Sequence, residues 1–269
     1  MFYLLPWLLF VILYIPIFIQ LYALRWQEID YTHAYFILPV AIWLVWRRRD
    51  SIIPISSTKP SSTVFSLLLL IFGLLLYLLG WRQDYLFIST FSIIPVSLGL
   101  ILYFYGKKTA QALLFPCLYL LLLIPPPLGI LDSITLPLRY GVAISADIIL
   151  KIFSIPILRE GLLLSINGNE IYMGAPCSGL RSLVTMLALG LVYIHLIPLS
   201  FKSKIQLSLA IIPLALLGNL LRILATCLTI YFLGPKIAEG RIHMITGLII
   251  FTMMLACFVS FEKHLEENE

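Results

Sequence analysis

One cysteine stands where a nucleophile would be expected. Cys177 follows Pro176 and precedes a long apolar run, so the sequence predicts that it begins a helix. The first turn of a helix has unpaired N–H groups and a partial positive charge, which lower the pKa of a thiol and favour the reactive thiolate. Arg181, four residues later, would lie on the same face and add positive potential. The alternative is that Cys177 is a small residue at a helix start, with Ser178 as the cap.

Two further side chains have the chemistry that a thiol nucleophile needs. Arg222 lies inside a predicted span, where an arginine is costly unless it is paired or hydrated, so it is a functional candidate. Asn219 is three residues earlier, on the same helix face. His243 begins the last predicted span, and Gly247 one turn later would let another helix approach closely. Histidine can transfer protons and arginine can stabilise an oxyanion, although an arginine that holds helix ends and an interfacial histidine are the structural alternatives.

The chain that carries these residues must use the bilayer as its solvent. Of its 269 residues, 61% are hydrophobic and 12% are charged, whereas a soluble domain has about a quarter charged residues. The mean hydropathy is +1.03. The net charge of +5 is scattered, and no basic patch is interleaved with aromatic residues, so nucleic acid is not an expected partner. The four cysteines show no metal-ligand spacing, so we expect no metal and no cofactor.

The apolar runs predict an all-α polytopic membrane protein of about eight transmembrane helices, in a single integral membrane domain over 1–269. The runs cover roughly 2–22, 34–46, 63–80, 85–105, 109–124, 178–197, 206–232 and 243–261. Most lysines and arginines fall in one set of loops, whereas the opposite set holds Arg25, Arg82, Lys236 and Arg241. The positive-inside rule therefore predicts that both termini are cytoplasmic. It places Cys177, Arg222 and His243 toward the outer side.

The segment of about 125–176 is predicted to lie outside without spanning the membrane. A helical pattern over 130–153 carries Asp147 and Lys151, four residues apart in the order that favours an ion pair. We interpret it as an amphipathic helix at the outer interface. A ninth span near 140–158 is the alternative, and the two charges oppose it.

A short β-hairpin is predicted between this helix and the sixth span. Asn167-Gly168 lies between two apolar stretches, Leu162–Ile166 and Asn169–Met173. Both turn residues accept a positive φ, which a two-residue hairpin turn requires. The hairpin would deliver the chain directly to Cys177.

At these positions the sequence resembles the exosortase/archaeosortase family of membrane-embedded cysteine transpeptidases. The stretch Asp30–His33, followed by Arg47–Arg49, also resembles the family's N-terminal pattern. Ala34, where the family often has glycine, and Pro176 depart from it. The matching motifs are Ala175-Pro176-Cys177-Ser178-Gly179-Leu180-Arg181-Ser182, then Asn219-Leu220-Leu221-Arg222, then His243 with Gly247.

The resemblance implies that Cys177 is the nucleophile, His243 the general acid/base and Arg222 the stabiliser of the transition state. It implies exported protein substrates that end in a short motif, a transmembrane helix and a basic tail, and an acceptor at the cell surface. The expected location is the cytoplasmic membrane, in contact with lipid, with the site facing outside. The supporting residues would be Ser178, Gly179, Arg181, Asn219 and His33, the last of which is alternatively only interfacial.

Two alternative functions stay open at this point. A membrane cysteine protease that ends in plain hydrolysis would use the same residues. A non-catalytic transporter or scaffold would predict internal repeats or several charges at the membrane midplane. Apart from Arg222, the predicted spans carry almost none.

Overall fold

Helices dominate the structure, as the apolar runs predict. The computed structural model describes residues 4–28, 31, 33–52, 63–126, 130–238 and 241–268. Contacts divide the chain into two compact units, 1–127 and 128–269, each with its own helices and core. The single membrane domain over 1–269 stays a prediction.

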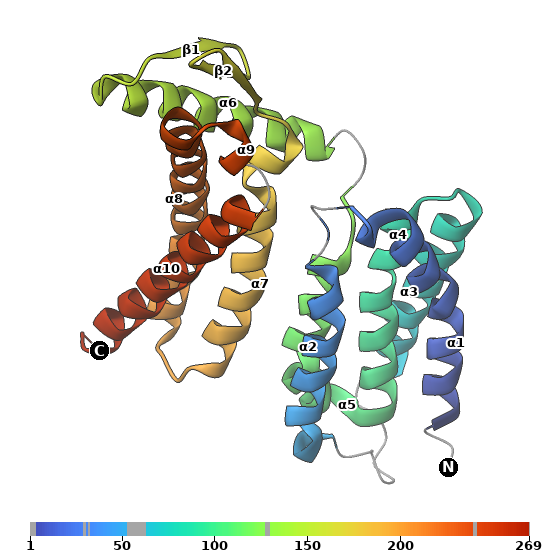
Figure 1. The fold of residues 1–269 in the computed structure, drawn as a ribbon. Helices are drawn as coiled ribbons and strands as arrows, with labels where there is room; N and C mark the ends of the chain where they lie inside the picture. The colour runs from blue at the N-terminus through green and yellow to red at the C-terminus, as the bar shows by residue number, and fades with distance from the viewer. Residues whose placement is uncertain are drawn as a thin grey trace. The chain divides into compact units, whose positions relative to one another are not determined.

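The first unit is a set of apolar helices (Figure 1). Helix α3 packs along α5, and α2 also contacts α5. One core cluster of this unit contains Ile101, Ala110, Leu113 and Cys117. The elements are α1 (Leu4–Leu21), η1 (Tyr22–Trp26), α2 (Ala34–Arg47), η3 (Arg49–Ser51), α3 (Thr63–Arg82), α4 (Leu86–Phe91), α5 (Ile93–Tyr119) and η4 (Leu120–Leu123).

Helix α5 is two helices joined at Gly106. The Gly106 backbone has φ 78° and ψ 179°, which is outside the helical region. The Ser97 hydroxyl donates to Cys117 Sγ over 3.8 Å, whereas a straight helix would separate these two residues by about 30 Å. The chain therefore folds back at Gly106, and the predicted runs 85–105 and 109–124 lie on the two sides of this fold.

The second unit places one helix crosswise over the others. Figure 1 shows α6 lying across the ends of α7 and α8, and the strands lie against α6. A core cluster joins α6, the strands and α8 through residues that include Ala143, Leu164, Met173 and Ile223. The elements are α6 (Ile130–Ile152), β1 (Ile157–Glu160), β2 (Leu163–Ile166), β3 (Asn169–Tyr172), η5 (Ala175–Ser178), α7 (Leu180–Leu196), α8 (Phe201–Leu233), α9 (Pro235–Ala238) and α10 (Arg241–Glu266).

The predicted β-hairpin is confirmed, and the sheet has one more strand. Strands β2 and β3 pair antiparallel across Asn167-Gly168, whose φ angles are 50° and 76°. Strand β1, which the sequence did not predict, pairs antiparallel with β2. Gly161, with φ 63°, turns the chain between them. The order β1-β2-β3 makes a small open sheet.

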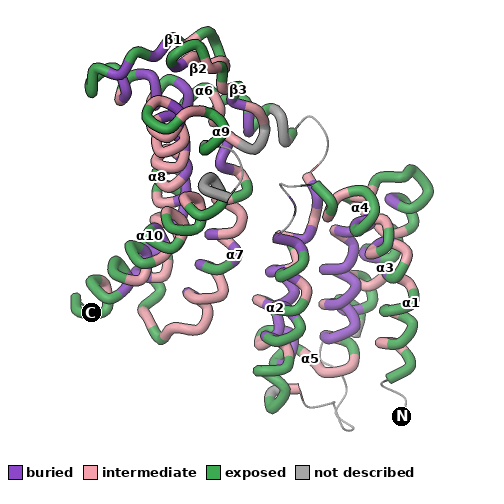
Figure 2. The backbone as a smooth tube through the Cα atoms, in the orientation of Figure 1, coloured by how far each residue is buried: buried purple, intermediate pink, exposed green. Residues whose placement is uncertain are grey.

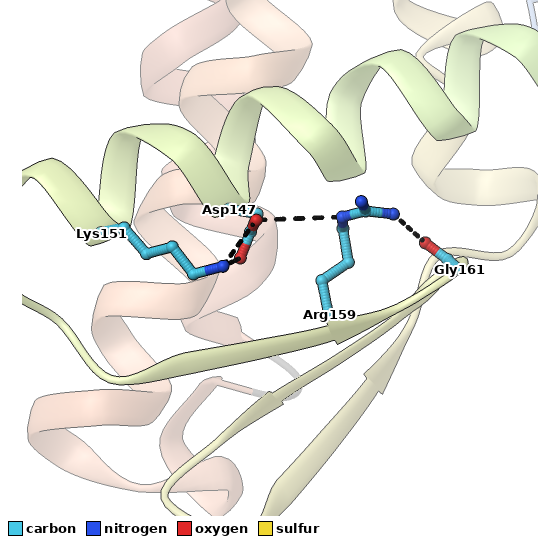
Figure 3. A network of polar contacts seen from close by, with 4 residues as sticks. All are labelled: Asp147, Lys151, Arg159 and Gly161. Atoms are coloured by element: carbon cyan, nitrogen blue, oxygen red, sulfur yellow. Dashed lines mark hydrogen bonds and ion pairs between the residues drawn. The ribbon is translucent and has the colours of Figure 1, made fainter.

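A network of ion pairs ties α6 to β1 (Figure 3). Lys151 Nζ lies 2.9 Å from Asp147 Oδ1, which confirms the predicted spacing of this pair. Arg159 Nε lies 3.9 Å from the same carboxylate, and Arg159 Nη1 donates to the Gly161 carbonyl oxygen over 3.2 Å. These contacts therefore hold strand β1, which was not predicted from the sequence, against helix α6, which was predicted.

The chain is a multi-pass membrane protein. Exposed residues run along its helices (Figure 2), and many of them are large and apolar; Leu4 is 73% exposed and Leu248 65% exposed. Water would penalise such surfaces, whereas lipid accommodates them. Six helical stretches among the described residues are long and apolar enough to span: Leu4–Trp26, Val64–Arg82, Leu86–Leu123, Ser133–Ile152, Phe201–Leu233 and Met244–Glu266.

The number of spans and the placement of α6 in the membrane stay predictions. Ala34–Arg47 and Leu180–Leu196 are apolar but shorter than these six stretches. Ser133–Ile152 is long enough to span, but α6 lies crosswise to α7 and α8. That arrangement favours an interfacial helix if α7 and α8 span.

Candidate active site

Cys177 lies in a tight turn that comes before helix α7. The turn η5 covers Ala175–Ser178, and the Cys177 N–H donates to the Gly174 carbonyl oxygen over 3.0 Å. Gly179 follows with φ 76°, a left-handed conformation that glycine adopts readily. Helix α7 then begins at Leu180. The prediction that Cys177 begins the helix is therefore wrong, because Cys177 lies within a 3₁₀ turn and the left-handed Gly179 separates that turn from the helix.

Asn219 of α8 holds this turn from the neighbouring helix. Its side chain is 1% exposed, and its Nδ2 donates to the Cys177 carbonyl oxygen over 3.0 Å. A Cβ at position 179 would lie 2.7 Å from Asn219 Cγ, so only glycine fits there. Asn219 and Gly179, which the sequence predicted as supporting residues, together fix the backbone that carries the thiol.

Ser178 is buried in the same turn. It is 1% exposed, and its Oγ accepts a hydrogen bond from the Leu180 N–H over 3.2 Å. The helix cap is Gly179, one residue later than the predicted Ser178. The Ser178 hydroxyl nevertheless satisfies the first amide of α7, which has no partner within the helix.

Arg222 lies on α8, three residues after Asn219. The residue is half-buried, and a Cβ at Gly247 of α10 would lie 3.5 Å from Arg222 Cδ. The arginine stem therefore packs beside α10 at the glycine that the sequence predicted as a point of close approach. The positive charge of Arg222 acts on the Cys177 thiol and lowers its pKa.

Burial has the largest effect on the thiol. Burial raises the pKa of Cys177 above its ordinary value, and Arg222, the Gly174 backbone and Arg139 oppose that rise. The sequence predicted a lowered pKa from a helix start and from Arg181. Instead the thiol precedes the helix, and Arg181 is exposed on α7. The cations that act on the sulfur come from α8 and α6.

Arg139 of α6 is the residue that the sequence analysis missed. Its Nη2 donates to Thr135 Oγ1 over 2.8 Å. Arg139 lies three and four residues before Val142 and Ala143 and so shares a helix face with them, but the sequence alone does not show that this face is buried. Both of these residues are buried in the core cluster against which Cys177 packs.

The residues of this site lie within a segment of the chain that matches a protein-family model. Residues 26–260 match the family model of the transmembrane exosortases (Exosortase_EpsH), a range that includes Cys177, Arg222 and His243. The chain belongs to the exosortase family. Searches of the curated proteins and of the solved structures return no match. Exosortases are known as membrane cysteine transpeptidases that sort exported proteins carrying C-terminal signals.

The predicted acid/base of this exosortase lies at the start of α10. His243 is in the first turn of that helix, and its side chain lies outside the described residues. Position 243 is four residues before Gly247, so the two positions share a helix face. The Arg222 stem packs beside that face at Gly247. The role of His243 stays a prediction.

His33 belongs to the other unit of the exosortase chain. It precedes α2 and is 8% exposed, and its ring centroid lies 5.9 Å from that of Tyr31. Asp30 and Thr32 of the same motif lie outside the described residues. A supporting role for His33 stays a prediction. Within the described ranges, no three His, Cys, Asp or Glu side chains gather as metal ligands would.

Proposed function

We propose that this chain is a cysteine transpeptidase that cleaves C-terminal sorting signals from exported proteins and transfers the new C-terminus to a surface acceptor. One observation carries the proposal. Two side chains of α8, Asn219 and Arg222, act on the backbone and on the ionisation of Cys177, the cysteine of the stretch that resembles the family's motif. A nucleophile with a fixed backbone and a nearby cation suits acyl transfer.

The first step would form a thioester. Cys177 gives its thiol proton to His243, the resulting thiolate attacks the carbonyl carbon of the scissile peptide bond, and Arg222 stabilises the oxyanion that develops. The C–N bond then breaks, and the amine of the departing C-terminal fragment takes a proton from His243. The substrate acyl group remains on the sulfur.

The second step would release the product. A nucleophile of the acceptor gives its proton to His243 and attacks the thioester carbonyl. The C–S bond breaks, and the thiolate of Cys177 returns. Water in place of the acceptor would give a free carboxylate, which is the hydrolytic alternative.

The substrate would approach through the membrane. A C-terminal signal with a transmembrane helix and a basic end can share the bilayer with the exposed apolar helices of the enzyme. The lysines and arginines of the loops support both termini in the cytoplasm and a site at the outer face of the cytoplasmic membrane. The cut would then fall near the outer interface.

The decisive experiment replaces Cys177 by alanine. The full chain is expressed in membranes with an exported reporter protein that ends in a host sorting signal, namely a short motif, an apolar helix and a basic tail. Cys177→Ala should abolish processing of the reporter, and Cys227→Ala, which alters a buried cysteine of α8, should not. Processing by a stable Cys177→Ala protein would disprove the proposal.

Mass spectrometry of the processed reporter separates the two enzymatic alternatives. A conjugated C-terminus supports transfer, whereas only a free acid in cells that hold the acceptor supports hydrolysis. A thiol-reactive probe tests the non-catalytic alternative. Bound reporter protein should protect Cys177 from the probe if the chain is an enzyme, whereas a scaffold gives no reason for such protection.

A further inference from the structure

We propose that Arg139 of α6 is a second cation of the thiol site, a positioning residue that favours the anionic form of Cys177. The inference rests on the proposed function, because it assigns a further residue to the same nucleophile. It adds a third element to the site: α6 joins the turn that carries the sulfur and the helix that carries Arg222.

The first support is the face of α6 on which Arg139 lies. Residues three, four, seven and eleven positions after Arg139 return to one side of a helix. Those residues are buried, and the turn η5 lies against the same helix. Cys177 packs against the cluster that they form. The four residues are Val142, Ala143, Ala146 and Leu150.

The second support is the orientation of the guanidinium. Arg139 Nη2 donates to Thr135 Oγ1 over 2.8 Å, one turn earlier on α6. Thr135 is 3% exposed. A buried hydroxyl therefore restrains the side chain, and a restrained cation acts on its neighbour more effectively than a mobile one.

The third support is electrostatic. The positive charge of Arg139 lowers the pKa of the Cys177 thiol, by less than Arg222 does and against the larger effect of burial. Of the other ionisable side chains, Arg222 of α8 also lowers the pKa of the thiol. Cys227 of α8 lies in the same core cluster and Tyr231 of α8 packs against it, whereas Arg181 of α7 is exposed. Cations thus act on the sulfur from two helices, and the loss of either should reduce the thiolate.

The test follows the alkylation of Cys177 by iodoacetamide as a function of pH, with peptide mass spectrometry on the full chain in native membranes. Arg139→Gln should move the midpoint of the curve to higher pH. Alkylation at neutral pH should fall by about three-fold or more, since a nearby cation shifts a pKa by up to about 1–3 units. Arg139→Lys keeps the charge and should keep the midpoint close to that of the unaltered protein.

Lys151→Gln is the matched control. It removes a cation from the same helix, but that cation pairs with Asp147, so the midpoint should not move. Thr135→Val removes the hydroxyl that restrains Arg139 and should move the midpoint in the same direction by a smaller amount. This variant decides the matter if Arg139→Gln does not accumulate in the membrane.

Three results would overturn the inference. The first is an unchanged midpoint of the alkylation curve in Arg139→Gln, or in Thr135→Val if Arg139→Gln does not accumulate. The second is an alkylation rate that falls by the same factor at every pH. The third is a midpoint that moves as far in Lys151→Gln as in Arg139→Gln. An equal fall would report altered access to the sulfur instead of altered ionisation. Alkylation does not depend on processing, so these results remain distinct from a failure of the proposed function, which Cys177→Ala reports.

Discussion

The polar groups of residues 128–269 include two clusters that are built differently. Around Asp147, a carboxylate lies between Lys151 and Arg159, so opposite charges meet within the folded chain. Around Cys177, arginines of α8 and α6 act on a thiol that is neutral in its ordinary state. The charges of the first cluster are already paired in the folded protein. In the second cluster, the attraction to the arginines grows when negative charge appears on the sulfur or on a bound substrate. This difference separates a structural cluster from a candidate catalytic one.

The largest expected contrast comes from removing one cation from each cluster. Arg222→Gln should lower the processing rate by about 10²–10³-fold, which is typical for the loss of an oxyanion-stabilising group. Lys151→Gln should leave the rate within about three-fold, because the lysine of this pair is 57% exposed and such a pair contributes at most about 1 kcal/mol. Initial rates with the reporter protein measure both. Similar losses in the two variants would remove the distinction between the clusters.

The pH dependence of the thiol gives the next contrast. Burial raises the pKa of Cys177, so the thiol is protonated at neutral pH and the thiolate forms as the pH rises toward that pKa. Alkylation should therefore increase about ten-fold per pH unit below the midpoint. Arg222→Gln should move this midpoint upward, whereas Lys151→Gln should not. A curve that is flat from neutral to alkaline pH would contradict the effect of burial.

Asn219→Ala should have a smaller effect that falls on stability. The substitution leaves the Cys177 carbonyl oxygen without its amide donor, which costs about 1–3 kcal/mol at a buried site. Asn169→Ala in the hairpin is the control, and it should change stability by about 0.5 kcal/mol or less. Thermal unfolding in detergent measures the difference. Equal melting temperatures for the two variants would show that Asn219 does not hold the turn.

The smallest expected effect concerns the network at Asp147. Lys151→Gln removes a pair whose lysine side chain is 57% exposed, so the unfolding free energy should fall by about 0.2–1 kcal/mol. Arg159 remains beside the carboxylate and limits the loss. Added salt should reduce the difference between the variant and the unaltered protein. A difference that is independent of salt would mean that packing, not charge, is lost.

The features that the sequence predicts well depend on local patterns. Apolar runs long enough for the bilayer predict the helices, because lipid requires every backbone group to bond within its own segment. The pair Asn167-Gly168 predicts the β2–β3 hairpin, since both residues accept the positive φ of its turn. The spacing of Asp147 and Lys151 predicts their ion pair. Each of these signals lies within a few neighbouring residues.

The features that the sequence does not predict depend on contacts between distant segments. Strand β1 has no alternating pattern, and its extended form depends on pairing with β2. Pro176 suggested a helix start, because proline favours the first helical position, but Gly179 delays the helix by several residues. Arg139 was missed because the burial of its helix face follows from packing against the strands and α8. Patterns of neighbouring residues do not predict contacts between segments that are distant in the sequence.

The fit between Gly179 and Asn219 limits how this protein can be redesigned. Any larger residue at position 179 would need both a left-handed backbone and space that the Asn219 side chain fills. A smaller residue at position 219 would provide that space but would remove the donor to the Cys177 carbonyl oxygen. No single compensating exchange repairs both defects. Engineers who alter this exosortase should therefore keep both positions unchanged and vary the neighbouring residues instead.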